Sequence, residues 1–461
     1  MIACQGPAWA QQYSLYNSRT LYDVFENPSQ SAYQIDTSRR FAFNFFIPNI
    51  GINATFSGDG ESSFKSLIYD GVFKGTGLEL GKGSRNNRLA LNTNNYLAMF
   101  RMLKTVKKSR EIGLSWQVRN DARVRATNET FALFDDFDLF AEDSYKDIVN
   151  DYLLNQSYHQ FSLSYRENVT RRLSVGVKAS LLSGISYNEL KVRNSELNIY
   201  PEDDEIDIMV AGRFRSSFML DNFEASSIKP NFRNPGLSIT AGAGYKFKYG
   251  WSVFGNLKDL GIIRWSKSSY EYAFNTGQII INNASNSTSD DRLADSLDKR
   301  ISNSRTNKSF ISTINGKIEF LVNKDFGNYQ PNLIVAKSLF NNAGDIALIN
   351  NYRFRNYVFT LSTAYNTNMF MQVGGQFMIK TPNKEFFIGS DQLFKTIQFA
   401  KGFNDSSPPY PAGYTGASFY LGAGFKFGRV LEHPANANYI PGMEESNGGG
   451  FIKRIFRKKS N

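Results

Sequence analysis

Residues that could carry out catalytic or metal chemistry are scarce in this sequence of 461 residues. The single cysteine, Cys4, and the two histidines, His159 and His433, provide no zinc-ligand cluster and no internal disulfide. No Ser or Cys stands in a nucleophile-elbow context. His159 beside Asp135 or Asp143 is the one conceivable general-base arrangement, but a lone His is more often structural. We therefore predict no enzyme, no cofactor and no metal site.

A cluster of carboxylates lies between Leu133 and Asp151. Calcium loops space their ligands in a D-x-D-x-D-G pattern, which this segment lacks. The segment is therefore predicted to be a solvated external loop.

Charged residues that alternate with apolar residues offer a second kind of chemistry. They are Arg119, Asp121, Arg123, Arg125, Lys178, Lys317 and Glu319. If such residues line a pore, rings of Arg and Lys select anions. If the same charges are removed from water, they must instead be paired in a network of salt bridges and hydrogen bonds. We favour the paired network and keep the anion-selective lumen as the alternative.

The elements that position these charges have a period of two. From Ile112 to Ala126 the apolar residues occupy one face and the charged residues the other, and the pattern returns at 161–166, 173–181, 313–322 and 418–427. Alternation of this kind indicates strands with one apolar and one polar face. Several of these strands reach the roughly 9 to 11 residues that a tilted strand needs to cross a bilayer.

The connections and the aromatic residues separate a membrane barrel from a soluble sandwich. Short connections near Arg166–Arg172, Lys248–Gly250 and Asn366–Asn368 contrast with long polar loops at 57–86, 127–157 and 267–307. Short periplasmic turns, long extracellular loops and aromatic residues near the strand ends are typical of outer-membrane barrels. The helical spacing of Leu293, Leu297 and Ile301 predicts a short amphipathic helix in an outer loop.

We therefore predict an all-β fold: a closed antiparallel transmembrane β-barrel over residues 41–428. Closure leaves no unpaired strand edge in lipid. About 14 strands are expected, within a range of 12 to 16, because single-chain bacterial barrels have even numbers. Strict alternation of direction fails between residues 190 and 235, so this stretch is either wrongly divided or a hairpin in an external loop.

The two ends of the chain suggest export. Ala8-Trp9-Ala10 resembles a signal-peptidase site, so residues 1–10 are predicted to be a signal-peptide remnant and 11–40 an N-terminal segment. The last predicted strand carries an expected barrel-assembly signal at Phe425 and Phe427. Residues 429–461 form a predicted periplasmic tail, in which Arg454, Arg457, Lys458 and Lys459 could dock a partner.

Composition supports the same interpretation. Phe, Trp and Tyr make up 15% of the chain, which argues against disorder. The net charge of +11 comes from 53 basic and 42 acidic residues and is not gathered in one patch, so no nucleic-acid partner is expected.

Several segments resemble a known family. They are 234–247, 257–265, Phe25-Glu26-Asn27-Pro28, 167–176 and 386–391. These segments are similar to a family of Bacteroidota outer-membrane β-barrels of unknown function, distantly similar to type IX secretion-associated (PorP/SprF-like) and FadL-like barrels. The resemblance covers most of residues 25–428 and implies an outer-membrane barrel without catalytic residues.

The predicted function is a structural or interaction component of an envelope or secretion assembly in the outer membrane of a Gram-negative bacterium. The alternative is an outer-membrane channel for small solutes, with anions favoured. Expected partners are outer-membrane lipid, the barrel-assembly machinery and, through the tail, periplasmic or secretion-system proteins.

Overall fold

The computed structural model describes residues 16–31, 39–71, 78–80, 86–105, 110–133, 139–218, 228–283, 289–302, 305–340, 344–366, 371–403 and 414–430. Strands dominate these residues. The strands are β1 (Arg39–Phe43), β2 (Ile50–Ser57), β3 (Asn86–Thr105), β4 (Arg110–Thr127), β5 (Ser144–Lys146), β6 (Tyr152–Asn168), β7 (Leu173–Tyr200), β8 (Glu205–Ser216), β9 (Pro235–Lys246), β10 (Trp251–Trp265), β11 (Tyr270–Asn275), β12 (Ile279–Asn282), β13 (Arg305–Asn307), β14 (Phe310–Thr313), β15 (Lys317–Lys324), β16 (Tyr329–Ser338), β17 (Gly344–Phe354), β18 (Tyr357–Asn366), β19 (Met371–Lys380), β20 (Lys384–Ser390) and β21 (Tyr414–Val430). The helices are α1 (Asp23–Glu26), α2 (Glu61–Asp70), α3 (Asn128–Leu133), α4 (Ser289–Ser302) and α5 (Leu393–Gly402).

The sheet closes into a ring in which every pairing is antiparallel. β1 and β2 together count as one strand of the barrel wall, and β14 and β15 together count as another. The order around the ring is β1/β2, β3, β4, β6, β7, β9, β10, β14/β15, β16, β17, β18, β19, β20 and β21, and β21 pairs again with β1 and β2. Within the described residues this is a closed barrel of 14 strands, so the predicted fold class is confirmed.

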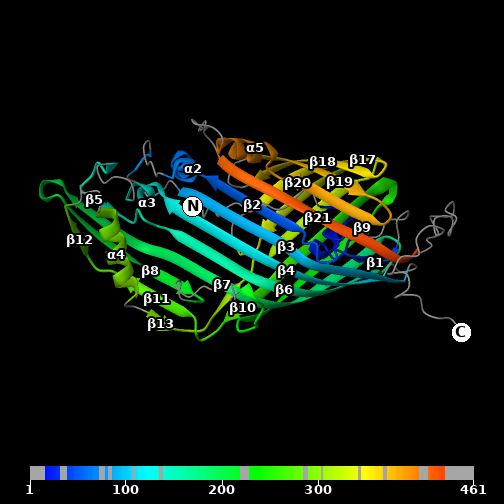
Figure 1. Cartoon of the computed structure of the whole chain (residues 1–461), viewed down its shortest axis with the longest axis horizontal. Coiled ribbons are helices and arrows are strands. Elements are labelled where there is room, and N and C mark those ends of the chain that lie inside the picture. Colours follow the sequence, from blue (N-terminus) through cyan, green and yellow to red (C-terminus); the bar gives the residue numbers. More distant parts are fainter. Residues whose placement is uncertain are drawn as a thin grey trace.

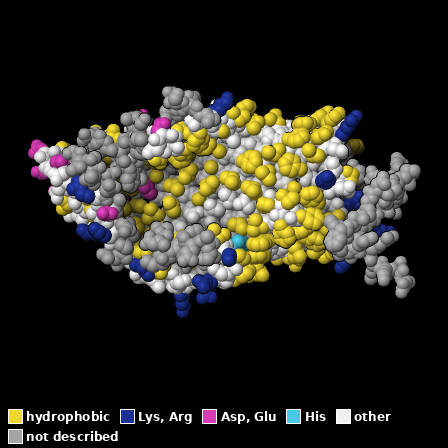
Figure 2. Space-filling view, viewed as in Figure 1, with side chains coloured by type: hydrophobic (Ala, Val, Ile, Leu, Met, Phe, Trp, Pro, Cys, Tyr) yellow, Lys and Arg dark blue, Asp and Glu magenta, His cyan; other side chains and the backbone are white. Residues whose placement is uncertain are grey.

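The two faces of the wall differ as alternation predicts. Along β9 every second side chain is buried and the others are exposed. Leu237, Leu181 and Leu163 on the outer face are 63%, 56% and 55% exposed. Figure 2 shows hydrophobic side chains as a broad band between charged side chains at the two ends of the molecule. No helix among the described residues is long and apolar enough to cross a membrane.

The barrel has one tall side and one short side (Figure 1). β7 is 28 residues long, whereas β15 to β20 have 7 to 11 residues each. Residues Leu173–Ser183 of β7 pair with β9, and residues Asn188–Tyr200 of β7 pair with β8, which pairs in turn with β11 and β12. The described residues after position 190 therefore form a hairpin beyond the 14-strand ring, which agrees with the second of the two alternatives left open by the sequence.

This external layer has its own hydrophobic core. Leu197, Ile206, Ile208 and Ile281 are at most 4% exposed and pack with Leu293 of α4. The amphipathic helix expected near residues 289–301 is confirmed as α4, and it packs on its own protein's strands.

Short turns gather at one end of the barrel, where β1 begins and β21 ends. The turns after Asn168 and Phe247 lie there, as expected. The sequence also predicts a short turn at this end after Asn366, but Asn366 lies at the opposite end, because β18 runs from the turn at 355–356 away from the short-turn end.

Candidate functional site

The lumen contains the chain's own N-terminal segment. Residues 16–31, here called the plug, enter the barrel, form the single turn α1 and return toward the short-turn end. Val24 and Phe25 are 0% exposed, and Leu21 is 1% exposed. Sequence analysis placed residues 11–40 in front of the barrel and did not anticipate that part of this segment fills the lumen.

Glu26 connects the plug to the middle of the wall. Its carboxylate forms an ion pair with Lys258 and accepts hydrogen bonds from Asn94 Nδ2 (2.9 Å) and from the Tyr96 hydroxyl (2.7 Å). Burial alone would raise the pKa of Glu26, but the positive charge of Lys258, followed by that of Arg119, lowers this pKa to about 2. Glu26 is therefore ionised and fully engaged with the wall.

Buried cations of the wall donate hydrogen bonds to backbone carbonyls of the plug. Arg101 donates to the carbonyl of Val24 (3.1 Å), and Arg166 donates to the carbonyl of Ser29 (2.9 Å). Lys380 donates to the Arg19 carbonyl at 2.7 Å. Cations directed at backbone carbonyls can hold a segment whose side chains carry little charge of their own.

Asp23 is the other acidic residue of the plug, and its pKa is shifted in the opposite direction to that of Glu26. Its carboxylate accepts a hydrogen bond from the Arg19 backbone N–H (3.0 Å). Burial raises the pKa of Asp23 to about 7, and the Arg19 hydrogen bond and the charge of Lys380 only partly oppose this effect. Asp23 therefore titrates near neutral pH.

Glycines shape the wall around the plug. A Cβ at Gly242 would lie 2.8 Å from Asn27 Oδ1, and a Cβ at Gly113 would lie 2.9 Å from Phe25 Cε1. A Cβ at Gly176 would overlap the carbonyl of Pro28. Because these positions face the lumen, only glycine leaves room for the plug there.

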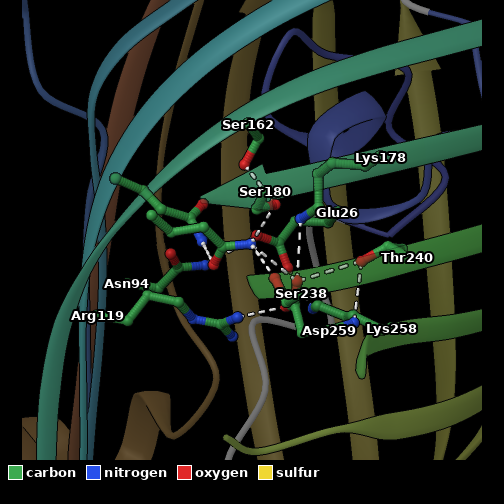
Figure 3. Close-up of polar contacts among 12 residues, drawn as sticks. Glu26, Asn94, Arg119, Ser162, Lys178, Ser180, Ser238, Thr240, Lys258 and Asp259 are labelled. Carbon is green, nitrogen blue, oxygen red and sulfur yellow. Dashed lines mark hydrogen bonds and ion pairs between the residues drawn. The ribbon is translucent and has the colours of Figure 1, made fainter. Parts of the chain in front are cut away.

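Close to Glu26, the lumen contains a charge network centred on Asp259 (Figure 3). Asp259 forms ion pairs with Arg119 and with Lys178, the latter at 3.2 Å. It also accepts hydrogen bonds from Gln160 Nε2 (3.1 Å) and Thr240 Oγ1 (3.2 Å). The network therefore joins β4, β6, β7, β9 and β10, which are consecutive strands of the wall.

A β-bulge places Asp259 in this network. The register between β9 and β10 shifts between Leu257 and Leu260, and Asp259 adopts φ 51°. Lys258 and Asp259 are adjacent in sequence, yet both are buried in the lumen at 5% and 0% exposure. Regular alternation would point one of them at lipid, so sequence periodicity could not identify Asp259 as the partner of Arg119.

The charged residues singled out in the sequence fall into two groups: those with side-chain partners near the plug and those that lie further toward the long-loop end. Arg119 and Lys178 share Asp259, while Glu319 accepts hydrogen bonds from Tyr16 (2.7 Å) and Asn256 (2.9 Å). The remaining candidates point into the lumen above the plug: Asp121 and Lys317 beside a small cavity, and Arg123 and Arg125 nearer the long-loop end. Two cavities of about 60 Å³ each are lined by described residues of the plug and of the wall, one beside Glu26 and one beside Asn17 and Arg19.

The other candidate residues lie away from the plug. His159 accepts a hydrogen bond from Trp116 Nε1 (3.2 Å), and its other ring nitrogen contacts the Ile228 carbonyl. Phe425 and Phe427 of β21 pair with Phe43 and Phe41 of β1.

Some of the sequence candidates cannot be placed. Asp135, His433 and the tail residues Arg454, Arg457, Lys458 and Lys459 lie outside the described residues. Within the described part of the chain no group of three or more His, Cys, Asp or Glu side chains could hold a metal ion.

Fold and site together define a closed antiparallel β-barrel whose lumen is occupied by its own N-terminal segment. The chain belongs to the family of unknown function DUF5723, whose model matches residues 34–391. That match supports the resemblance to a family of unknown function, while the predicted Bacteroidota origin and the relationship to type IX secretion-associated barrels stay predictions. No curated protein matches the sequence.

Solved structures with similarity to this chain include a toluene transporter and a FadL homologue. The Ralstonia pickettii toluene transporter TbuX shares 8% identity at a TM-score of 0.44, with 89% of this chain and 94% of that chain covered. A Pseudomonas aeruginosa FadL homologue shares 12% identity at a TM-score of 0.43, with coverage of 90% and 96%. Similarity at this level says nothing about what this chain carries.

Proposed function

We propose that this protein is an outer-membrane channel of a Gram-negative bacterium whose resting state is closed by the plug. The observation that carries the proposal is the buried N-terminal segment, held by Glu26–Lys258 and by cations on its backbone carbonyls. The outward band of exposed Leu, Ile and Phe side chains supports a lipid environment, because a closed barrel leaves no unpaired backbone in hydrocarbon. Passage of a solute then requires the plug to move.

The ion pairs inside the lumen change the channel alternative that was proposed from the sequence. In that alternative Arg119 and Lys178 would select anions, but Asp259 neutralises part of their charge, as in the paired network that the sequence favours. These residues support the closed lumen, and any selection of solutes has to occur above them.

A second candidate function is a structural or interaction component of the envelope, the role first predicted from the sequence. The observation that favours it is the external layer with its own core, which a channel does not require. Lipid, the barrel-assembly machinery acting on Phe425 and Phe427, and periplasmic proteins at residues 429–461 remain the proposed partners. If pull-downs with and without residues 429–461 recover the same proteins, the tail has no docking role.

The channel proposal is tested by adding one methyl group under the plug. Gly176→Ala places a Cβ against the Pro28 carbonyl, and overpacking of this kind costs about 1–3 kcal/mol. We expect openings in planar bilayers to become roughly tenfold more frequent, since about 1.4 kcal/mol corresponds to a factor of ten.

Gly255→Ala is the matched control, because its Cβ would meet Phe320 at an ordinary 3.6 Å. We expect this variant to stay as closed as the unmodified protein. If both variants conduct alike, or if neither conducts more than the unmodified protein, the plug at Pro28 does not control opening.

A further inference from the structure

The outer face of the tall side contains an apolar groove. It has a volume of about 880 Å³ and crosses β3, β4, β6, β7, β9 and β10. Its larger lining side chains include Leu114, Trp116, Phe161, Leu181 and Leu237. Ala98 and Ala179 also line the groove, and their small side chains leave room between these larger neighbours. The groove faces away from the lumen, since Leu181 and Leu237 belong to the exposed outer face.

The outer face becomes polar just beyond the groove, on the side of the long loops. Pairing of Cα atoms aligns lining residues of neighbouring strands across the wall: Trp116, Phe161, Leu181 and Leu237. Four residues from Trp116 and from Phe161 toward the long loops, Ser157 Oγ donates to Asn120 Oδ1 at 2.8 Å. Aromatic residues next to polar ones are typical of the level at which hydrocarbon meets lipid headgroups. The groove therefore reaches the headgroup region at this end.

Residues 228–234 cover the outer wall at this level. The Ile228 carbonyl contacts His159 Nε2, and the ring centroids of Phe232 and Phe161 are 5.7 Å apart. His159 and Phe161 lie two residues apart on the outward face of β6, so the covering segment lies on the membrane side of the wall. Ile228 and Phe232 are 47% and 48% exposed. The segment therefore adds apolar surface to the rim of the groove.

Cations border the groove at the same rim. Arg233 belongs to the covering segment, and Arg264 is exposed on β10 between two buried residues. The Ser266 backbone N–H donates to Asn234 Oδ1 at 2.9 Å, which brings the chain around Arg264 beside the chain around Arg233. Lys229 is exposed in the covering segment as well. Among the described residues none of these three cations forms an ion pair, so their charge is available to a ligand.

The groove and its rim fit different parts of one ligand. Five strand steps of about 4.8 Å make the groove roughly 24 Å wide, so several acyl chains can lie in it side by side. Guanidinium groups bind phosphate through paired hydrogen bonds. Basic residues beside apolar membrane-facing surface are typical of sites for phosphorylated lipid headgroups. The ligand is therefore a lipid with several acyl chains and with more than one phosphate.

We propose that the groove and its cationic rim bind lipid A, which has this chemistry. The acyl chains lie in the groove, and Arg233, Arg264 and Lys229 bind phosphate at the rim. A phospholipid with two chains and one phosphate would use only part of the groove and part of the rim. The site rests on the proposed function in the outer membrane, with the long-loop end at the outer leaflet.

The site is tested by native mass spectrometry of the full-length protein in detergent, titrated with purified lipid A. We expect one lipid A molecule to be retained per barrel. Arg233→Gln/Arg264→Gln should weaken binding about tenfold or more, because hydrogen bonds from charged groups to phosphate are lost. Ala179→Phe places a ring in the groove and should also weaken binding, at unchanged charge. These changes affect exposed side chains, and far-ultraviolet circular dichroism checks that the barrel is intact.

Matched controls carry the same changes elsewhere on the outer surface. Arg171→Gln/Arg172→Gln removes two exposed cations from the turn after β6, at the short-turn end. Ala243→Phe adds a ring at an exposed alanine of β9 outside the groove. We expect both controls to bind lipid A as the unmodified protein does.

The proposal is overturned if a control loses as much affinity as the matching site variant, or if no lipid A is retained. It is also overturned if dephosphorylated lipid A or phosphatidylglycerol binds as tightly as lipid A. Because lipid binding needs no conduction, failure here is distinct from failure of the channel proposal.

Discussion

Glu26 and Asp23 lie three residues apart in the plug and respond to pH in opposite ways. Glu26 sits against Lys258, and its contribution to the docked plug is present above the ordinary pKa of 4.5 and is lost only as the pH falls toward 2. Asp23 is buried without an ion pair strong enough to keep it charged, and its pKa is about 7. Its contribution is complete below the ordinary pKa of 3.8 and is lost as the pH rises through 7.

The plug should therefore be released more readily at pH 8 than at pH 6. We expect the frequency of spontaneous openings in planar bilayers to increase over this interval. Asp23→Asn keeps the hydrogen-bond geometry without a titratable proton and should remove most of the increase. A pH dependence that is the same in the Asn variant would assign the titration to another group.

Alternation along the sequence predicted the direction of side chains in regular strands, and it failed at the β-bulge. The alternation around Ile112–Ala126 correctly separated the buried Arg119 from the outward Leu114. It could not supply the partner of Arg119, because Asp259 reaches the lumen only through a bulge at positive φ. A bulge depends on tertiary pairing and leaves no period in a single sequence.

At the scale of elements, α5 occupies a place where the wall lacks a strand. β20 ends at Ser390, while β19 and β21 continue beyond it. Helix α5 packs there, and Thr396 Oγ1 accepts from the Ser418 backbone N–H at 2.9 Å. Phe394 and Ile397 of α5 are 62% and 46% exposed, in continuity with the apolar outer face. An amphipathic helix at this height would lie in the outer membrane interface.

This placement predicts the environment of a spin label on α5. In a Cys4→Ser background, a nitroxide at position 394 should collide with oxygen more than with a water-soluble nickel complex. A label at position 202, in the external turn after β7, should show the reverse preference. Equal accessibility of the two labels to both reagents would place α5 in water and the membrane boundary lower on the barrel.

The plug is the element that sequence reasoning missed entirely. Its one helical turn, Asp23–Glu26, is too short to produce a period, and it is stabilised by wall residues more than 60 positions away. The Phe25-Glu26-Asn27-Pro28 segment did stand out, but only through resemblance. Segments held by long-range contacts to backbone carbonyls carry no local signal of their position.

At the scale of the whole molecule, the net charge of +11 is divided between two roles. Arg101, Arg166 and Lys380 hold the plug inside the barrel, whereas Arg119 and Lys178 form ion pairs with Asp259 of the wall. The ring of 14 strands and its lipid-facing surface followed from alternation and closure. The division of charge did not, because it depends on which residues the closed ring brings together.

The most direct test of the account is the ionic current through barrels that lack residues 16–31. The plug residues around Glu26 are buried inside the barrel, and two cavities of about 60 Å³ each lie beside them. We predict that the full-length protein stays closed in planar bilayers and that the deletion variant shows stable open channels of uniform conductance. A deletion variant that folds and inserts but stays as closed as the full-length protein would contradict the plugged-channel account.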